Sequence, residues 1–173
     1  MRTQYKDITD SAQLKVADYA AEQDFCKIFH AEMQSFYQLA LMLTGSHTKA
    51  EQSFSAALSD CLRATGTFKA WALSRSRLAV IERAIKNAEP TLREVPAGVS
   101  KQMEAILRLD VFDRFVYVLT VLETYSVRDC AILLRRRVTE INAARLRVMA
   151  AIAAPATQAL APINNLLLAP LSA

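Results

Sequence analysis

The residues best suited to chemistry are three consecutive arginines and the polar positions that follow them. Arg135, Arg136 and Arg137 adjoin one another, and guanidinium groups hold phosphate oxygens through paired N–H donors. The next residues include side chains that suit contact with base edges or phosphates: Thr139, Asn142, Arg145 and Arg147. Because asparagine pairs with adenine and arginine with guanine, this segment suits contact with duplex DNA. The alternative interpretation is a solvated turn.

A second candidate group combines one tryptophan with cations. Trp71 precedes Arg75, Arg77 and Arg83 on one predicted helix. An indole that stacks on bases, together with nearby cations, suits single-stranded DNA. A lone tryptophan among apolar neighbours is more often a core residue, and both interpretations stay open.

The charges of the chain gather in two basic blocks. The 173 residues carry a net charge of +4. Residues 63–89 and residues 128–147 each hold 6 basic and 2 acidic side chains, a net of +4 each, whereas residues 1–62 hold 5 basic and 8 acidic ones. Each basic block can neutralise several phosphates, or it can be a solvated helix face.

The sequence gives no support for catalysis, a cofactor, a metal site, a disulfide framework or a membrane span. No phosphate-binding glycine loop, nucleophile elbow or HExxH pattern occurs, so we expect no enzyme and no cofactor. The three cysteines and two histidines are too scattered for a metal site or a disulfide framework, so reduced thiols in a cytoplasmic chain are expected. The first ten residues lack the apolar region of a signal peptide. The sequence has no uninterrupted run of about 20 apolar residues, so we expect no membrane-spanning helix.

Helical periodicity predicts an all-α fold. Apolar residues recur at three- and four-residue steps in 11–44, in 68–86 and in 103–122. Gly45 is suited to end the first segment. Ser46 or Thr48 can cap the next helix, and Glu51 follows Thr48 at capping-box spacing.

The elements group into four predicted regions. Residues 11–87 form a helical N-terminal domain, 88–100 a linker with Pro and Gly, 101–152 a second helical domain, and 153–173 an apolar tail. In the second domain, Ser126 with Asp129 and then Thr139 can cap two short helices, which outlines a helix-turn-helix, although an ordinary bundle fits as well. Prolines interrupt the tail, and we expect it to fold back on the helices or to bind a partner.

Residues 122–152 match a known pattern, Leu-Glu-Gly-(Leu/Tyr)-Ser-Tyr-x-Glu-Ile-Ala-x-(Ile/Leu)-Leu-Gly, followed by a turn and a second helix. The fitting residues are Leu122, Glu123, Ser126, Ala131, Leu133, Leu134 and, in the second helix, Ile141. The segment resembles region 4 of bacterial RNA polymerase sigma factors of the extracytoplasmic-function type. Upstream, Leu107, Leu109, Arg114, Val116 and Val118 match the start of the same domain.

The first half is similar to region 2 of that family. The matching residues are Tyr37, Ala40, Leu43, Gly45, Ala50 and Glu51, with Trp71 before the promoter-facing helix. Together the two parts cover about 100 of 173 residues, in the family's order. The chain departs from the pattern at Gln52, Ser55, Leu78, Arg135 and Arg136, and it has Asn142, Ala144 and Arg145 in the second helix.

The resemblance implies a transcription initiation protein with no catalytic residue. Region 2 would bind core RNA polymerase through Glu51, Gln52 and Ser55, and promoter DNA at the −10 element through Trp71 and its arginines. Region 4 would bind the −35 element, and an anti-sigma factor is a candidate regulator. The alternatives are a degenerate sigma-like regulator that acts as a stand-alone DNA binder or through protein partners, and a plain helical interaction module.

Overall fold

The chain is all-α, as its periodicity predicts. A computed structural model describes residues 18–88 and 95–158. The helices are α2 (Glu22–Ala31), α3 (Met33–Thr44), α4 (His47–Arg63), α5 (Lys69–Asn87), α6 (Lys101–Leu107), α7 (Val111–Tyr117), the π-helical turn η1 (Val118–Leu122), α8 (Val127–Leu134) and α9 (Val138–Gln158). Within the described ranges, extended pairing is limited to one isolated bridge between Tyr19 and Phe68.

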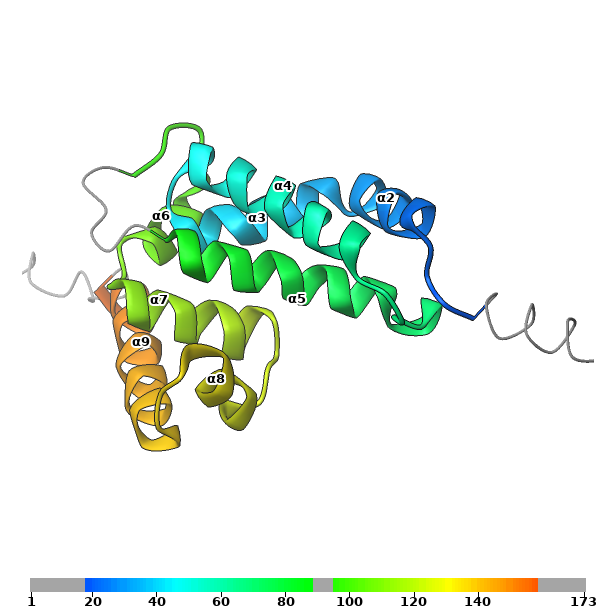
Figure 1. Cartoon of the computed structure of the whole chain (residues 1–173). Helices are drawn as coiled ribbons and strands as arrows, with labels where there is room; N and C mark the ends of the chain where they lie inside the picture. Colours follow the sequence, from blue (N-terminus) through cyan, green and yellow to red (C-terminus); the bar gives the residue numbers. More distant parts are fainter. Residues whose placement is uncertain (1–17, 89–94, 159–173) are drawn as a thin grey trace, which may run out of the picture.

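The helices gather in two halves, which we call the N-unit (α2–α5) and the C-unit (α6–α9) (Figure 1). In the N-unit, α4 and α5 pack along each other and α3 packs against both. Phe25, Phe29, Phe36 and Leu43 fill the centre and are almost fully buried. These are the positions that recur at helical spacing in the sequence, so periodicity identified this core.

Local signals set the helix ends of the N-unit. Gly45 ends α3 in the left-handed conformation at φ 74, as predicted. The side chain of Ser46 caps α4 by accepting a hydrogen bond from the Lys49 amide. Thr48 therefore lies inside the helix, and the predicted Thr48–Glu51 capping box was wrong. The predicted single helical stretch to residue 44 is broken at Glu32, whose backbone leaves the helical region at φ −98, ψ 11.

The predicted helix over 103–122 is also divided. Arg108, Leu109 and Asp110 separate α6 from α7, and the last turn of this stretch is π-helical. The Glu123 amide donates to the Val118 carbonyl (2.9 Å), and the Tyr125 amide donates to the Leu119 carbonyl (2.9 Å). Widened turns of this kind are frequent at functional sites.

Two helices joined by a three-residue turn complete the C-unit. Ser126 caps α8, as predicted: its hydroxyl accepts from the Asp129 amide (3.1 Å) and donates to the Asp129 carboxylate (2.6 Å). The predicted Thr139 cap of α9 was wrong, because the helix begins at Val138. The Glu140 carboxylate instead accepts from the Arg137 amide (2.8 Å), which satisfies one of the free donors at the helix start.

Helix α9 is longer than predicted. It continues past residue 152 and through Pro155 to Gln158, so the expected start of the tail falls inside the helix. The remainder of the predicted tail, 159–173, lies outside the described residues, as do residues 11–17 and the centre of the predicted linker, 89–94.

The two units share one hydrophobic core. Buried apolar residues form a single cluster that includes Phe36 and Ile81 of the N-unit and Val116 and Ile141 of the C-unit. Helix α3 contacts both α6 and α7 across the boundary. Arg114 is fully buried at this boundary, where its guanidinium donates to the carbonyls of Leu43 (3.2 Å) and Leu107 (3.4 Å).

Candidate partner and nucleic-acid surfaces

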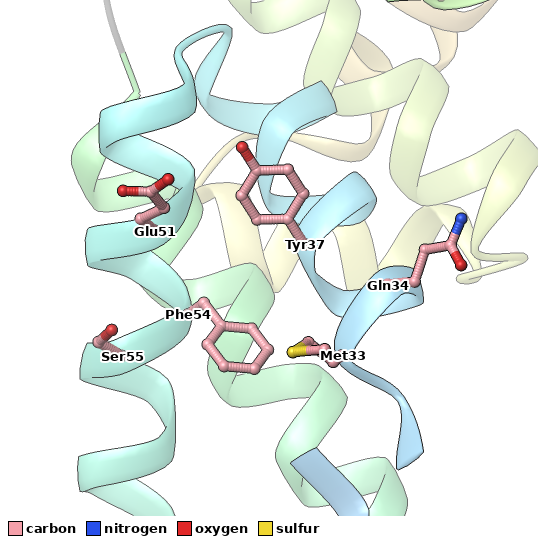
Figure 2. A pocket seen from close by; sticks show the side chains of 6 residues that line it. All are labelled: Met33, Gln34, Tyr37, Glu51, Phe54 and Ser55. Carbon is pink, nitrogen blue, oxygen red and sulfur yellow. The ribbon is translucent and has the colours of Figure 1, made fainter. Parts of the chain in front are cut away.

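A groove of about 420 Å³ runs between α3 and α4. Its walls are Met33, Gln34 and Tyr37 from α3 and Glu51, Phe54 and Ser55 from α4. In Figure 2, Met33 and Phe54 point toward each other across the groove, and Glu51 lies at its edge. Of the three predicted polymerase contacts, Glu51 and Ser55 therefore line the groove. The third, Gln52, is exposed on the same helix outside it.

A hydrogen-bonded chain fixes one end of the groove. The His47 ring joins the Tyr37 hydroxyl (2.7 Å, to Nδ1) and the Ala97 carbonyl (3.2 Å, to Nε2). Because a carbonyl only accepts, the His47 Nε2 carries a proton and donates it to the Ala97 carbonyl. Burial, and then the nearby Glu51 carboxylate, raise the pKa of Tyr37 above its ordinary value, so the hydroxyl remains a donor at neutral pH.

Trp71 is not a core residue. Its side chain is 65% exposed, so the interpretation of Trp71 as buried was wrong. It belongs to an exposed aromatic row at the start of α5. Phe68 packs edge-on against Trp71 with ring centres 5.3 Å apart, and Tyr19 stacks on Phe68 at 4.7 Å. Periodicity missed Tyr19 and Phe68, because the isolated bridge between them joins residues 49 positions apart.

The three arginines of α5 point in different directions. Arg75 follows Trp71 by four residues and so shares its face; its Nη1 lies 3.8 Å from Glu82. Arg83 forms two hydrogen bonds with Asp60 of α4 (2.5 and 2.6 Å). This pairing lowers the pKa of Asp60 and raises that of Arg83.

Arg77 contacts the C-unit. It forms two hydrogen bonds with the Glu123 carboxylate, from Nε (2.5 Å) and from Nη2 (3.0 Å). The hydrogen bonds that Arg77 donates to the Glu123 carboxylate raise the pKa of Arg77. Of the four predicted region 2-like residues, only Trp71 and Arg75 thus lie together on an accessible face.

The three consecutive arginines also diverge. Arg135 ends α8 in the left-handed conformation at φ 52, and it lines a groove of about 470 Å³ between α8 and the C-terminal half of α5. The guanidinium of Arg136 lies over the Phe112 ring at 5.6 Å and 3.8 Å from Glu140. In the described part of the chain, Arg137 and Arg145 have no side-chain ion pair, whereas Arg147 pairs with Asp113 (2.5 Å).

The outward face of α9 is almost without charge. Ile141, Ala144 and Val148 are buried against the rest of the C-unit, so Ala144 does not lie at a DNA-facing position. The opposite side carries Thr139 and Asn142, both exposed, together with large apolar side chains. These are Val138, Leu146 (73% exposed) and Met149.

The cysteines and the possible metal ligands were also located in the structure. No group of three or more His, Cys, Asp or Glu residues in 18–88 and 95–158 is arranged to hold a metal ion. Cys61 and Cys130 are buried and Cys26 is exposed, and all three are free thiols. Burial raises the pKa of Cys130 to about 11. Among the helices in these ranges, none has the length and hydropathy to cross a bilayer.

No protein-family model matches the chain. No curated protein matches it either. Among solved structures, the chain is similar to the sigma factor RpoE from Bartonella quintana, solved in complex with the anti-sigma factor NepR. The identity is 16%, the TM-score is 0.48, and the match covers 78% of this chain and 98% of that chain.

Proposed function

We propose that this chain is a sigma-like transcription initiation protein that binds core RNA polymerase and directs it to promoter DNA. It performs no catalysis of its own and acts in the cytoplasm. In this proposal, the predicted domain 11–87 acts as the region 2-like part and the predicted domain 101–152 as the region 4-like part. An anti-sigma factor is the candidate regulator.

One backbone observation supports this proposal most strongly. The region 4 pattern has glycine at two places, which fall on Thr124 and Arg135 here. Among the described residues, these are the only non-glycine positions with positive φ, at 56° and 52°. Such a conformation favours glycine and costs a β-branched residue such as Thr124 the most. The backbone thus keeps, at both places, the conformation that the glycines of the pattern would adopt.

The α3–α4 groove is the proposed polymerase contact. It combines an apolar floor with a carboxylate at its edge, which suits an amphipathic helix with a basic residue. The predicted contacts Glu51 and Ser55 line this groove, and Gln52 extends the same surface. Met33, Tyr37 and Phe54 join the proposed contact set.

The aromatic row of Tyr19, Phe68 and Trp71 is the proposed contact for bases of the −10 element. Exposed rings that lie in a row offer π-faces on which unpaired bases stack, at about 1–3 kcal/mol per base. Arg75 supplies the cation on the same face. Arg77 and Arg83, which are paired internally, contribute only when those pairs open.

The turn and the start of α9 are the proposed contacts for the −35 element. Arg135, Arg136 and Arg137 would hold phosphates, and Thr139 with Asn142 would face the bases. Arg145 and Arg147 lie on the flanks of the helix. Arg137 and Arg145 have no internal ion pair in the described ranges, so they are the cations most ready to bind phosphate.

The outward face of α9 favours the second candidate function. Val138, Leu146 and Met149 surround Asn142 on this face, and apolar side chains gain little from a phosphate backbone. A protein-interaction module, without direct promoter contact by α9, would use the same face to bind another helix.

Association with core RNA polymerase of the same source tests the proposed function. We expect a complex on gel filtration at low salt and at moderate salt. Met33→Glu and Glu51→Lys should each weaken it at least tenfold, because they place charge in the groove or reverse the charge at its edge. Leu73→Glu is the control, since Leu73 is also exposed but lies outside the groove. Equal loss in all three variants, or no complex at all, would refute the groove as the contact.

A further inference from the structure

Helix α9 has apolar positions on two opposite faces. It packs on α7 and α8 at the edge of the C-unit, with Ile141, Ala144 and Val148 buried (Figure 1). A second set of positions recurs at three- and four-residue steps on the other side of the helix, and all of them are exposed and uncharged. We call this set the outer stripe: Val138, Thr139, Asn142, Leu146, Met149 and Ala150.

The outer stripe exposes large apolar side chains. Leu146 is 73% exposed, Met149 49% and Val138 46%. Single exposed apolar residues are ordinary on protein surfaces, but these three share one face of one helix. Because a helix that is apolar on both faces is normally covered on both, the outer stripe is a candidate docking surface.

The sequence that follows α9 has the composition of a segment that can cover such a face. We call residues 159–173 the tail segment. From Val148 to Ala173 no side chain is charged, and 6 of the 15 residues after Gln158 are leucine or isoleucine. Three of these leucines, 166–168, are consecutive. Removal of so much apolar surface from water is favourable, so the tail segment gains from an apolar face within its reach.

The outer stripe is within reach, because the tail segment follows α9 directly. Leu146 lies 12 residues before the end of α9 at Gln158, which is about 18 Å along the helix axis. Leu166 follows Gln158 by eight residues, and eight residues of chain span up to about 28 Å. The three leucines can therefore return as far as Leu146. Attachment to the same helix also gives the segment a high effective concentration at this face.

The charges beside the outer stripe favour the tail segment over other occupants. Arg145 and Arg147 flank the stripe, and both are exposed. A symmetric contact with a second copy would bring the arginines of the two copies close together, whereas the tail segment adds no charge. DNA phosphates would pair with the arginines but would give little to the apolar side chains between them.

We propose that the tail segment docks on the outer stripe of α9, with its three consecutive leucines against Leu146 and Met149. This inference does not rest on the proposed function. Docking of this kind opens locally, without unfolding of α9 or of the core. Thr139 and Asn142 are therefore available to another ligand whenever the segment is released.

Thiol reactivity at the outer stripe tests the docking in the full chain. The reporter is Leu146→Cys in a Cys26→Ser background, where the two other cysteines are buried, and the probe is N-ethylmaleimide. Leu167→Asp with Leu168→Asp should release the tail segment, because carboxylates resist burial against apolar side chains. We expect the reporter to react at least fivefold more slowly in the chain without these two tail substitutions than in the chain with them.

Two controls separate docking from other effects. Ser172→Asp adds a carboxylate at a polar position of the tail segment and should leave the slow reaction unchanged. Leu73→Cys, an exposed reporter on α5, should react at one rate in every tail variant. Equal rates of the Leu146→Cys reporter with and without the two leucine substitutions would overturn the proposal. Protection that grows with protein concentration would also overturn it, because a second copy would then cover the stripe.

A disulfide keeps the proposal testable if the aspartates cause aggregation. Leu146→Cys and Leu167→Cys in one chain should form an intramolecular disulfide with oxidised glutathione. This reaction should be at least fivefold faster than the reaction that joins Leu73→Cys to Leu167→Cys. Equal rates for the two pairs would contradict docking on the outer stripe.

Discussion

At the scale of single residues, Arg135 is the side chain whose backbone fits it least. It ends α8 at φ 52, where glycine would be free of strain. A cation kept at a strained position points to a use for its charge, and the proposed use is contact with phosphate. The conformation and the charge can be separated by mutation.

We therefore expect opposite effects of Arg135→Gly on stability and on DNA binding. Relief of strain should raise the free energy of unfolding by about 1 kcal/mol. Loss of the cation should weaken DNA binding and lower its salt dependence by about one phosphate contact. Chemical denaturation and a salt titration of binding measure the two effects. Arg137→Gly is the control, because residue 137 does not have positive φ, so it should lose affinity without gaining stability.

Short-range signals explain which residue positions were predictable. Gly45 and Ser126 act through neighbours within four positions, and both behave as the sequence predicts. The aromatic row around Trp71 was not predictable, because Tyr19 and Phe68 lie close together only in the folded chain. Thr139 fits a cap by type, yet Glu140 makes the capping contact from one residue further along.

At the scale of elements, α9 has one buried and one exposed apolar face. Ile141 is fully buried, whereas Leu146, five positions later, is 73% exposed. Periodicity alone does not separate the two faces, because both carry apolar residues. The packing of α9 on α7 and α8 decides which one is buried.

This assignment predicts a contrast between two substitutions. Ile141→Ala should destabilise the chain by about 2–5 kcal/mol, because it leaves a cavity in the core. Leu146→Ala should change stability by less than about 0.5 kcal/mol, as expected at an exposed position. Thermal or urea denaturation measures both. A larger loss for Leu146→Ala than for Ile141→Ala would show that α9 packs through its other face.

At the scale of the whole molecule, the N-unit and the C-unit share one core. A Pro- and Gly-containing stretch between helical segments was the basis for predicting two helical domains. It did not predict the contacts across the boundary. Arg77 donates hydrogen bonds to Glu123, which lies 46 positions away in the sequence. Arg114 donates to the carbonyl of Leu43, which lies 71 positions away. Neither pairing follows from local pattern, because each depends on how the units dock.

The buried cysteines report on this shared core. Cys61 lies in α4 of the N-unit and Cys130 in α8 of the C-unit, and burial raises the pKa of both thiols. A raised pKa keeps each thiol protonated near pH 8, so labelling requires unfolding. In a Cys26→Ser background, both thiols should become reactive at the same urea concentration. Two separate midpoints would show that the units unfold independently.

In vitro transcription is the most direct test of the proposed sigma-like function. Core RNA polymerase of the same source would be given genomic DNA fragments with and without this chain, and the 5′ ends of the transcripts would be mapped. We expect new start sites that depend on the chain and share sequence upstream at −10 and −35. Arg137→Ala should reduce these transcripts. No chain-dependent start sites, from a polymerase that is active with a known sigma factor, would contradict the proposed function.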